Sequence, residues 1–242
     1  MSTFVLIHGG CHGAWCWYKV IPALEKKGHS VIAPDLPSHG RDKTPVSAVT
    51  LQAYVDTVCD ILDAQREPVV LVGHSMGGGI ITQAAEYRPD KIKTLVYLTA
   101  LLPANGESMG KVLRRNTATV LANNFITNAD QSASMVREEV LVDGFYGDCS
   151  AEDVALAKLL LTPQATAPLR AKLQTSNARF GRIPRIAIEC LRDRAHSLAF
   201  QRSVYTTFPF QQVISMDTSH SPFFSAPDEL AAHLAATADG SV

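Results

Sequence analysis

A serine stands between a run of apolar residues and a cluster of glycines in the segment VVLVGHSMGGGI, residues 69–80. Residues 73–77 match the pattern G-x-S-x-G, with Ser75 in the middle. The apolar residues before Ser75 predict a buried strand, and the residues after it predict a helix. In a tight turn between the two, the serine hydroxyl projects from the sheet and the glycines avoid collisions with neighbouring backbone. The pattern therefore indicates a nucleophilic serine rather than a serine that only caps a helix.

A serine hydroxyl is a weak nucleophile at neutral pH and needs a base, which a carboxylate in turn orients. In strand–turn–helix sites of this kind the chain order is serine, acid, histidine. Three histidines follow residue 190, namely His196, His220 and His233. His196 begins a predicted helix and His233 lies on the face of the last one. His220 lies between the last predicted strand and helix, where a loop can reach Ser75, and it is the predicted base.

The acid is expected just after the preceding strand, which the apolar run at 185–191 predicts. Asp193 stands two residues beyond this run. Glu189 falls inside the strand, and Asp217 lies in the same loop as the predicted base, which makes it a weaker rival. The earlier strand end at 97–103 contains no carboxylate. Asp193 is therefore the predicted acid.

Acyl transfer also needs backbone N–H donors where negative charge develops on the carbonyl oxygen. One donor is expected from Met76, the residue after the nucleophile. The other is expected from the loop after the first strand, HGGCHGAW at 8–15, whose glycines allow close backbone approach. Gly10 is the predicted donor in this loop.

Apolar runs alternate with amphipathic segments at both ends of the chain. The predicted strands lie at 3–9, 30–36, 68–75, 92–102, 185–191 and 211–217. The predicted helices lie at 14–28, 51–65, 78–90, 197–207 and 227–238. Strands that are apolar almost throughout and separated by helices favour a parallel sheet covered on both faces, which is an α/β fold of about six strands.

The alternation is interrupted between 103 and 182, where no convincing strand is found. This segment carries helical patterns such as SAEDVALAKLLL at 150–161, in which Ser150 is placed to cap the helix. An all-helical insertion at this point predicts a lid over the strand ends, where open α/β sheets bind ligands. The expected organisation is a core in two parts, 1–102 and 183–242, with a helical cap at 103–182.

The composition excludes several classes of protein. The chain has 242 residues, a hydrophobic share of 46%, a charged share of 19% and a net charge of −1. These values predict one soluble globular domain and give no indication of nucleic-acid or membrane binding. The N-terminus lacks a secretory signal, and five scattered cysteines without CxxC spacing predict neither a disulfide framework nor a metal site. We therefore expect a cytoplasmic protein with reduced cysteines.

With these motifs placed, the chain resembles the α/β-hydrolases of the branch of plant methylesterases and hydroxynitrile lyases, together with their bacterial esterase relatives. The resemblance rests on residues 4–40 and on the segments LVGHSMGG, SAEDVALAKLLLTP and IECLRDRAHSLAFQR. It implies the α/β-hydrolase fold and a mechanism without cofactor or metal. By position it implies a triad of Ser75, Asp193 and His220, with Gly10 and Met76 as oxyanion donors.

The lyases of this branch differ from the chain at two positions. They carry a threonine where this chain has Gly9 and a lysine where it has Ser221, and those groups serve the cyanohydrin and cyanide. Their absence favours ester hydrolysis. The plant esterases usually have a methionine after the catalytic histidine, so the segment SHSPFF is closer to the bacterial members.

Aromatic and apolar residues near the first loop, in the lid and near His220 are candidates for the substrate pocket, although core packing explains several equally well. The candidates are His12, Trp15, Phe145, Tyr146, Leu159, Leu160 and Phe223. Cys11 and Cys16, near the oxyanion loop, are expected to be small buried fillers.

The functional hypothesis is a serine hydrolase that cleaves small carboxylic esters through an acyl-enzyme. The same triad leaves a carbamate or amide hydrolase open. A hydroxynitrile lyase and a ligand-binding receptor on this fold are less favoured alternatives. The expected partner is a small-molecule ester, and the sequence leaves open whether the chain is a monomer or a homodimer.

Overall fold

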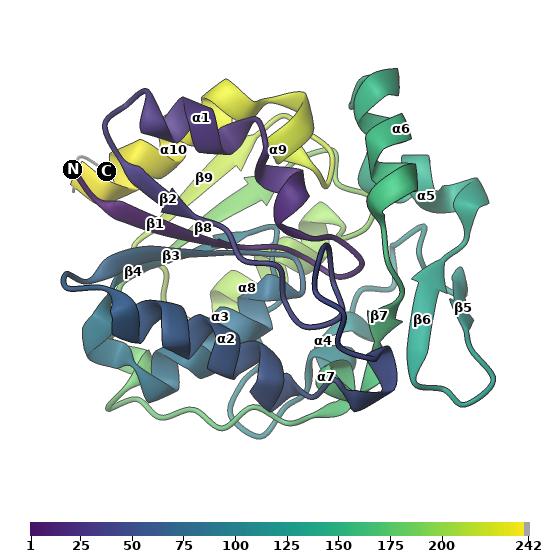
Figure 1. Ribbon diagram of the computed structural model, residues 1–242, viewed down its shortest axis with the longest axis horizontal. Helices are drawn as coiled ribbons and strands as arrows, with labels where there is room; N and C mark the ends of the chain where they lie inside the picture. The colour runs from purple at the N-terminus through teal and green to yellow at the C-terminus, as the bar shows by residue number, and fades with distance from the viewer. Residues whose placement is uncertain (240–242) are drawn as a thin grey trace.

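Six parallel strands form the central sheet of the computed structural model, which describes residues 1–239 (Figure 1). Their order across the sheet is β2-β1-β3-β4-β8-β9, and each neighbouring pair is parallel. The strands are β1 (Thr3–Ile7), β2 (Ser30–Ile32), β3 (Val69–His74), β4 (Ile92–Leu98), β8 (Arg185–Cys190) and β9 (Gln212–Met216). The predicted parallel α/β sheet is confirmed, and β3 lies near its centre.

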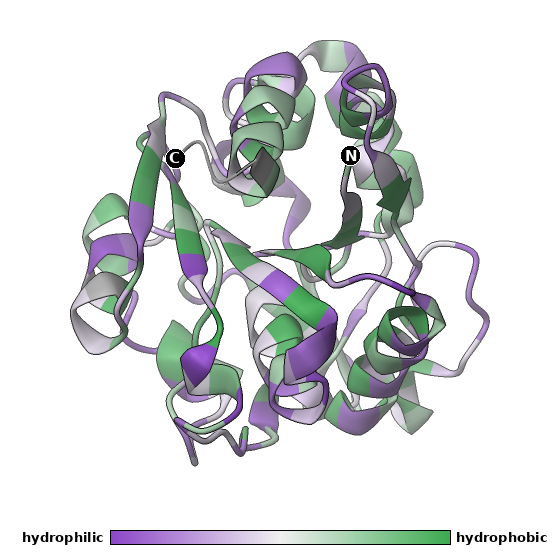
Figure 2. Cartoon of the chain, turned by 90° about the vertical axis from the view of Figure 1, so that its left-hand side faces the viewer, coloured by the Kyte–Doolittle hydropathy of each residue, from purple (hydrophilic) through white to green (hydrophobic). Residues whose placement is uncertain are grey.

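Helices cover both faces of this sheet (Figure 1). One layer contains α1 (Val20–Glu25), α9 (Pro222–Ser225) and α10 (Pro227–Asp239). The opposite layer contains α2 (Leu51–Ala64), α3 (Gly77–Tyr87) and α8 (Leu198–Thr207). Short 3₁₀ turns lie at Ala14–Trp17, Val46–Ala48, Pro89–Lys91 and Phe180–Arg182. Figure 2 shows hydrophobic and hydrophilic stretches alternating along the flanking helices, as expected for helices with one buried side.

The core is divided by the sheet into two halves because successive strand residues point to opposite faces. Along β1, Val5 and Ile7 belong to the half that contains α2 and α3. Phe4 and Leu6 belong to the half that contains α1 and α10. All four side chains are fully buried, which explains why the strand reads as a continuous apolar run.

The helix expected at 14–28 is broken in the structure. A 3₁₀ turn spans Ala14–Trp17, and α1 begins only at Val20. Pro22 thereby falls in the first turn of α1, where the missing N–H has no intrahelical partner to lose. Gly28, at φ 83°, follows the helix in the left-handed conformation that favours glycine.

The insertion between β4 and β8 is not purely helical, which corrects the sequence-based expectation. It contains three short antiparallel strands, β5 (Phe125–Thr127), β6 (Ala133–Val136) and β7 (Gln164–Ala165). Its helices are α4 (Met109–Leu113), α5 (Glu138–Phe145), α6 (Ala151–Leu160) and α7 (Thr166–Arg170). The strands are too short to show an alternating pattern, and β6 and β7 pair across two intervening helices.

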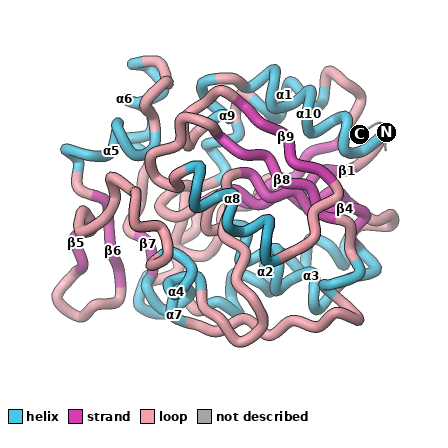
Figure 3. The backbone as a smooth tube through the Cα atoms, turned by 180° about the vertical axis from the view of Figure 1, so that it is seen from behind, coloured by secondary structure: helices cyan, strands magenta, loops and turns pink. Residues whose placement is uncertain are grey.

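The expected N-cap of α6 is present, since the Ser150 side chain accepts a hydrogen bond from the Asp153 amide at 3.1 Å. Figures 1 and 3 show the insertion at one end of the molecule and both termini at the other. β1 starts near the N-terminus, so the carboxyl ends of the parallel strands face the insertion. Within residues 1–239, every helix is too short or too polar to traverse a bilayer.

Helix α3 begins with three glycines, and the end of β1 and the loop after β4 lie very close to the first two. A Cβ atom on Gly77 would lie 2.8 Å from the carbonyl oxygen of Ile7 in β1. A Cβ on Gly78 would overlap the carbonyl oxygen of Leu101 and lie 2.7 Å from the Cβ of Ala100. Because the obstacles include backbone atoms, they cannot rotate away as a flexible side chain would. The glycines therefore set how closely α3 approaches the sheet behind Ser75.

We predict that Gly78→Ala destabilises the protein. Alanine favours a helix over glycine by about 1 kcal/mol, but the overlap with Leu101 is expected to outweigh this gain and lower the free energy of unfolding by about 1–3 kcal/mol. Gly147→Ala is the control, because its added Cβ would lie 3.8 Å from its nearest neighbours. Urea unfolding of the two variants and the wild type measures the difference, and equal stability of all three would contradict this account of the glycines.

Candidate active site

Ser75 occupies the turn between β3 and α3 in a left-handed conformation, with φ 51°. This conformation is uncommon for residues other than glycine and is unfavourable unless the surroundings hold it. Here the main chain holds it on both sides. The Ser75 amide donates to the Leu98 carbonyl at 3.2 Å, and the Ser75 carbonyl accepts from the Leu101 amide at 2.9 Å. The turn predicted from the glycine pattern is therefore present and fixed to the end of β4.

The predicted acid and base form a buried pair. Asp193 follows β8 and His220 follows β9, and the Nδ1 of His220 lies 2.7 Å from Oδ2 of Asp193. Oδ1 of Asp193 accepts from the amides of Ala195 and His196, at 2.8 and 2.7 Å. Oδ2 also accepts from the hydroxyl of Thr99 at 2.5 Å.

These contacts decide the charge of Asp193. Burial by itself raises the pKa of the carboxyl group. The charge of His220 and the hydrogen bonds lower this pKa by more than burial raises it, so the pKa lies below its usual value. The carboxylate is therefore ionised at neutral pH. Its bond to Nδ1 leaves Nε2 of His220 as the ring nitrogen available for proton transfer.

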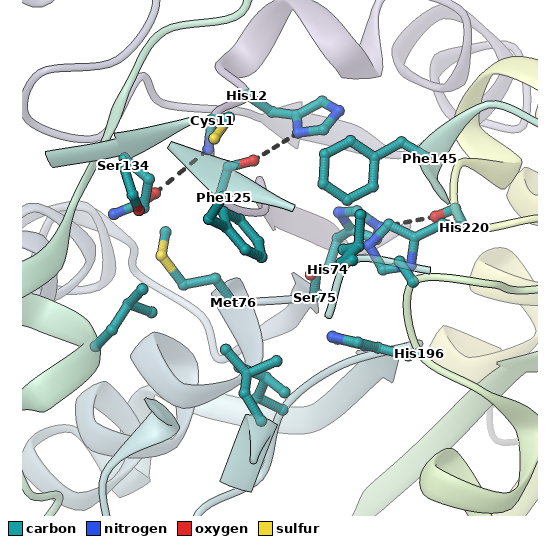
Figure 4. Close-up of a pocket in the computed structure, with 17 residues that line it drawn as sticks. Cys11, His12, His74, Ser75, Met76, Phe125, Ser134, Phe145, His196 and His220 are labelled. Carbon is teal, nitrogen blue, oxygen red and sulfur yellow. Dashed lines mark hydrogen bonds between the residues drawn. The ribbon is translucent and has the colours of Figure 1, made fainter. Parts of the chain in front are cut away.

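Ser75 and His220 line the same cavity, of about 70 Å³, together with Gly10 and Met76 (Figure 4). The strand ends and the first loop supply these four residues. Most of the remaining wall is apolar and comes largely from the insertion. Its larger apolar members are Leu101, Leu113, Leu121, Phe125, Phe145 and Leu169.

The loop that carries Gly10 is fixed by residues from the insertion. His12 donates from Nδ1 to the Gly10 carbonyl at 2.8 Å, and the Tyr146 hydroxyl donates to His12 Nε2 at 2.7 Å. The Gln164 side chain accepts from the Cys11 amide at 3.3 Å. Within residues 1–239, the amides of Gly10 and Met76 donate to no protein acceptor. Both N–H groups are therefore available to a ligand.

Three further histidines surround His220. The ring centroids of His74 and His196 lie 4.7 and 4.9 Å from that of His220, and His12 lies 6.1 Å from His74. Burial lowers the pKa of His12 and His196 to about 4, and the charge of His220 acts in the same direction. Burial also holds the pKa of His74 well below its usual value. These three rings are therefore neutral at neutral pH.

Three of the four rival residues from the sequence lie outside the cavity. Glu189 is buried within β8 and pairs with Arg202 at 2.8 Å. The exposed Asp217 pairs with Arg192. His233 lies on α10, 3.6 Å from Glu229. Only His196 among the rivals reaches the site, and it lines the cavity beside His220.

The candidate substrate residues divide into three groups. His12 and Phe145 line the cavity. Tyr146 and Phe223 are buried behind it, against the ring of His12. Trp15, Leu159 and Leu160 lie away from the cavity, so five of the seven candidates, including Tyr146 and Phe223, do not line it.

The structure gives the reason why Trp15, Leu159 and Leu160 lie away from the cavity. Trp15 and Leu160 line a separate surface groove. Leu159 is 81% exposed, because α6 directs Asp153 and Ala157 inward and turns Leu159 toward solvent. An apolar run at a helix end does not by itself reveal which residues face inward.

Sequence reasoning missed Thr99, Gln164 and the position of His196 in the cavity. The strand end at 97–103 contains no carboxylate, and its contribution to the site is the hydroxyl of Thr99, which donates to Asp193. No local pattern marks Gln164, whose contacts with Cys11, His39 and Tyr54 join residues more than 100 positions apart.

One group of side chains within residues 1–239 has the chemistry of a metal site. Ligand atoms of Asp193, His196 and His220 lie within 4.8 Å of one another. Their hydrogen bonds already explain this proximity, because Nδ1 of His220 binds Asp193 and Nδ1 of His196 lies 2.7 Å from the Thr99 carbonyl. The arrangement is that of a carboxylate bonded to one histidine, with a second histidine beside it.

The comparisons with known proteins identify the family. A family model described as the alpha/beta hydrolase family matches residues 4–233. Putative methylesterase 11 of Arabidopsis thaliana is 36% identical over 95% of this chain, which spans 62% of that relative. A pyrethroid hydrolase of Sphingobium wenxiniae is 36% identical, over 99% of this chain and 88% of its own. The crystal structure of a pyrethroid hydrolase from Sphingobium faniae JZ-2 superposes with a TM-score of 0.89 at 32% identity, covering 98% and 97% of the two chains.

A parallel sheet with a serine in the strained turn after its central strand defines a class of α/β enzymes. The chain belongs to the α/β-hydrolase family. Within it, the relatives place the chain in the branch of the plant methylesterases, as the sequence segments implied.

We predict that stability falls on mild acidification, because buried neutral histidines must be protonated on unfolding. The pKa of His12 and His196 is about 4 in the folded protein against 6.5 for free histidine. Between pH 6.5 and 4 the unfolded chain binds more protons, so each histidine reduces stability by up to about 1.4 kcal/mol per pH unit as the pH falls. Urea unfolding at pH 7 and pH 5 should show a loss of at least about 2 kcal/mol.

A single variant tests the source of this loss. Asparagine can retain the donor to the Gly10 carbonyl, so His12→Asn should make the pH dependence shallower. His233→Asn is the matched control on the outer helix α10 and should leave the slope as it is. An unchanged slope in His12→Asn would show that His12 is not one of the responsible groups.

Proposed function

We propose that Ser75, His220 and Asp193 are the catalytic triad of this carboxylic ester hydrolase. The observation that carries the proposal is the buried Asp193–His220 hydrogen bond beside the cavity that Ser75 lines. An imidazole held by a carboxylate and facing a serine in a strained turn is the arrangement that acyl transfer requires.

The three residues have distinct roles in the reaction. His220 Nε2 takes the proton of the Ser75 hydroxyl as the oxygen attacks the ester carbonyl. The imidazolium then gives this proton to the departing alkoxide, which leaves as an alcohol, and the acyl group remains on the Ser75 oxygen as an acyl-enzyme. Water attacks the acyl-enzyme in the same way and releases the acid. Asp193 fixes the histidine tautomer and stabilises the imidazolium.

The oxyanion is stabilised by the amides of Gly10 and Met76. Both residues line the cavity, and both amides lack a protein acceptor within the described residues. Their hydrogen bonds strengthen as charge develops on the carbonyl oxygen, and losing one such donor typically costs about 10²–10³ in rate. The hydrogen bonds of His12 and Gln164 keep the loop that carries Gly10 in position before substrate binds.

The cavity suits small, largely apolar esters. Residues 103–182 act as the lid, because Leu121, Phe125 and Phe145 of this segment close the cavity over the strand ends. All groups that the reaction needs come from the chain itself, so the mechanism uses no cofactor or metal. The five cysteines are free, which fits the reducing conditions of a cytoplasmic location.

Two positions disfavour lyase chemistry. A Cβ on Gly9 would lie 2.7 Å from Nδ1 of His74 and 3.0 Å from Cβ of Ser75, so a threonine side chain has no room there. Ser221, which replaces the lyase lysine, is fully buried. Hydrolysis of an acyl-enzyme needs neither group.

We predict that Ser75→Ala lowers kcat for p-nitrophenyl acetate by at least about 10³-fold, since no other group can form the acyl-enzyme. Steady-state assays measure the loss. A fluorophosphonate should label the wild type at Ser75 and leave the variant unlabelled, as mass spectrometry of the adduct would show.

Ser203→Ala, on the outer helix α8, provides a matched control, because it removes a serine hydroxyl that only bonds the carbonyl of Phe200. It should retain wild-type labelling. Wild-type turnover by Ser75→Ala, or an adduct at another residue, would refute the triad.

A further inference from the structure

His196 lies beside the proposed triad, and its own contacts fix its orientation. Its amide donates to Asp193, and its ring nitrogen Nδ1 lies 2.7 Å from the Thr99 carbonyl oxygen. Its ring is 4.9 Å from the His220 ring at an interplanar angle of 78°. Figure 4 shows His196 next to His220 on the wall of the cavity that Ser75 also lines. None of the steps proposed above uses this side chain.

The Thr99 contact determines which nitrogen carries the proton. A carbonyl oxygen can only accept a hydrogen bond, so Nδ1 must be the protonated nitrogen. In the neutral ring Nε2 is then an acceptor with a free lone pair. Burial lowers the pKa of His196 to about 4, so this neutral tautomer persists at neutral pH. Within residues 1–239, no protein group donates to Nε2.

The surroundings of Nε2 of His196 allow this free acceptor to influence which ligands bind. Much of its wall is apolar, including Leu101, Leu113 and Leu169. A purely apolar ligand that displaces water from Nε2 leaves this atom without a hydrogen bond, whereas a ligand with a correctly placed hydroxyl restores the bond. Sites that hydrogen-bond a substrate group select against analogues that lack it.

The position of the rings limits where that hydroxyl can be. His220 must reach both the Ser75 hydroxyl and the leaving oxygen during the reaction. With the His196 ring only 4.9 Å from the His220 ring, a group that touches His196 lies within a few bonds of the reacting carbon. The carbon next to the scissile carbonyl meets this condition.

We propose that Nε2 of His196 accepts a hydrogen bond from a substrate hydroxyl, so that the enzyme prefers esters of 2-hydroxy acids over their unsubstituted counterparts. His196 is then a specificity-determining residue. The proposal rests on the proposed function, because it assumes that Ser75 attacks the ester carbonyl in this cavity.

The test compares methyl 2-hydroxybutanoate with methyl butanoate by pH-stat titration. The measured quantity is the ratio of the two kcat/KM values, in wild type and in His196→Asn. Asparagine can keep the donor to the Thr99 carbonyl while withdrawing the acceptor from the cavity. We expect this ratio to fall about 10-fold in the variant. The difference in inherent reactivity between the two esters is the same for both enzymes, so it cancels when the wild-type ratio is compared with that of the variant.

His233→Asn is the control, a histidine removed from the outer surface, and it should keep the wild-type ratio. His196→Gln places an amide oxygen near the former position of Nε2 and should retain more of the preference than His196→Asn. An unchanged ratio in His196→Asn, including an equal loss of activity on both esters, would overturn the proposal and leave His196 with a structural role.

A second measurement needs no variant at position 196. In the wild type, 3-hydroxy-2-butanone should inhibit hydrolysis of p-nitrophenyl acetate at about 10-fold lower concentration than 2-butanone. Equal inhibition by the two ketones would overturn the proposal even if the Asn variant does not fold. If Ser75→Ala is inactive on both methyl esters while these comparisons fail, the triad stands and only the role of His196 is lost.

Discussion

A carboxylate that remains ionised inside the protein is the interaction on which the site depends. Asp193 is almost fully buried, and an unpaired charge there would be strongly unfavourable. It is stabilised because Thr99, two backbone amides and His220 all direct donors at its two oxygens. These donors belong to three segments that are distant in sequence, so the charge is stable only when β4, β8 and β9 are assembled.

The same strand ends also hold backbone strain. Ser75 and Thr99, which follow the adjacent strands β3 and β4, both have positive φ, at 51° and 39°. For a β-branched residue such as Thr99 this conformation is a clear outlier. Its hydroxyl binds Asp193 and its carbonyl oxygen accepts from His196, so the strained backbone places one residue in contact with both. The assembled sheet stabilises two turns that an isolated segment would not adopt.

The insertion contributes more than a cover over the strand ends. Tyr146 fixes the ring of His12, and Gln164 holds the Cys11 amide, so the first loop takes its shape from residues more than 100 positions later. Gly10, in this loop, lines the cavity. In the proposed mechanism the segment that closes the cavity therefore also positions one of the proposed oxyanion donors.

Local sequence was sufficient to predict the parallel sheet and the turn at Ser75. Buried parallel strands read as continuous apolar runs, and the turn needs glycines wherever a Cβ would overlap backbone, as at Gly78. The positions of Asp193 and His220, each just after a predicted strand, were also apparent from the apolar runs. The sheet and the turn depend on residues close together in the chain, where hydrophobic periodicity and steric limits act directly.

Only the tertiary structure showed the small sheet of the insertion, the solvent-facing position of Leu159 and the contacts of Thr99, Gln164 and His196. β7 has two residues and pairs with a strand about 30 positions earlier, so its partner cannot be read from its own sequence. His196 is neutral because it is buried, and its orientation depends on the carbonyl oxygen of Thr99, 97 positions earlier in the chain. The sequence by itself determined which elements form, whereas long-range packing decided which polar atoms meet, because hydrogen bonds at the site join groups that only the folded chain brings together.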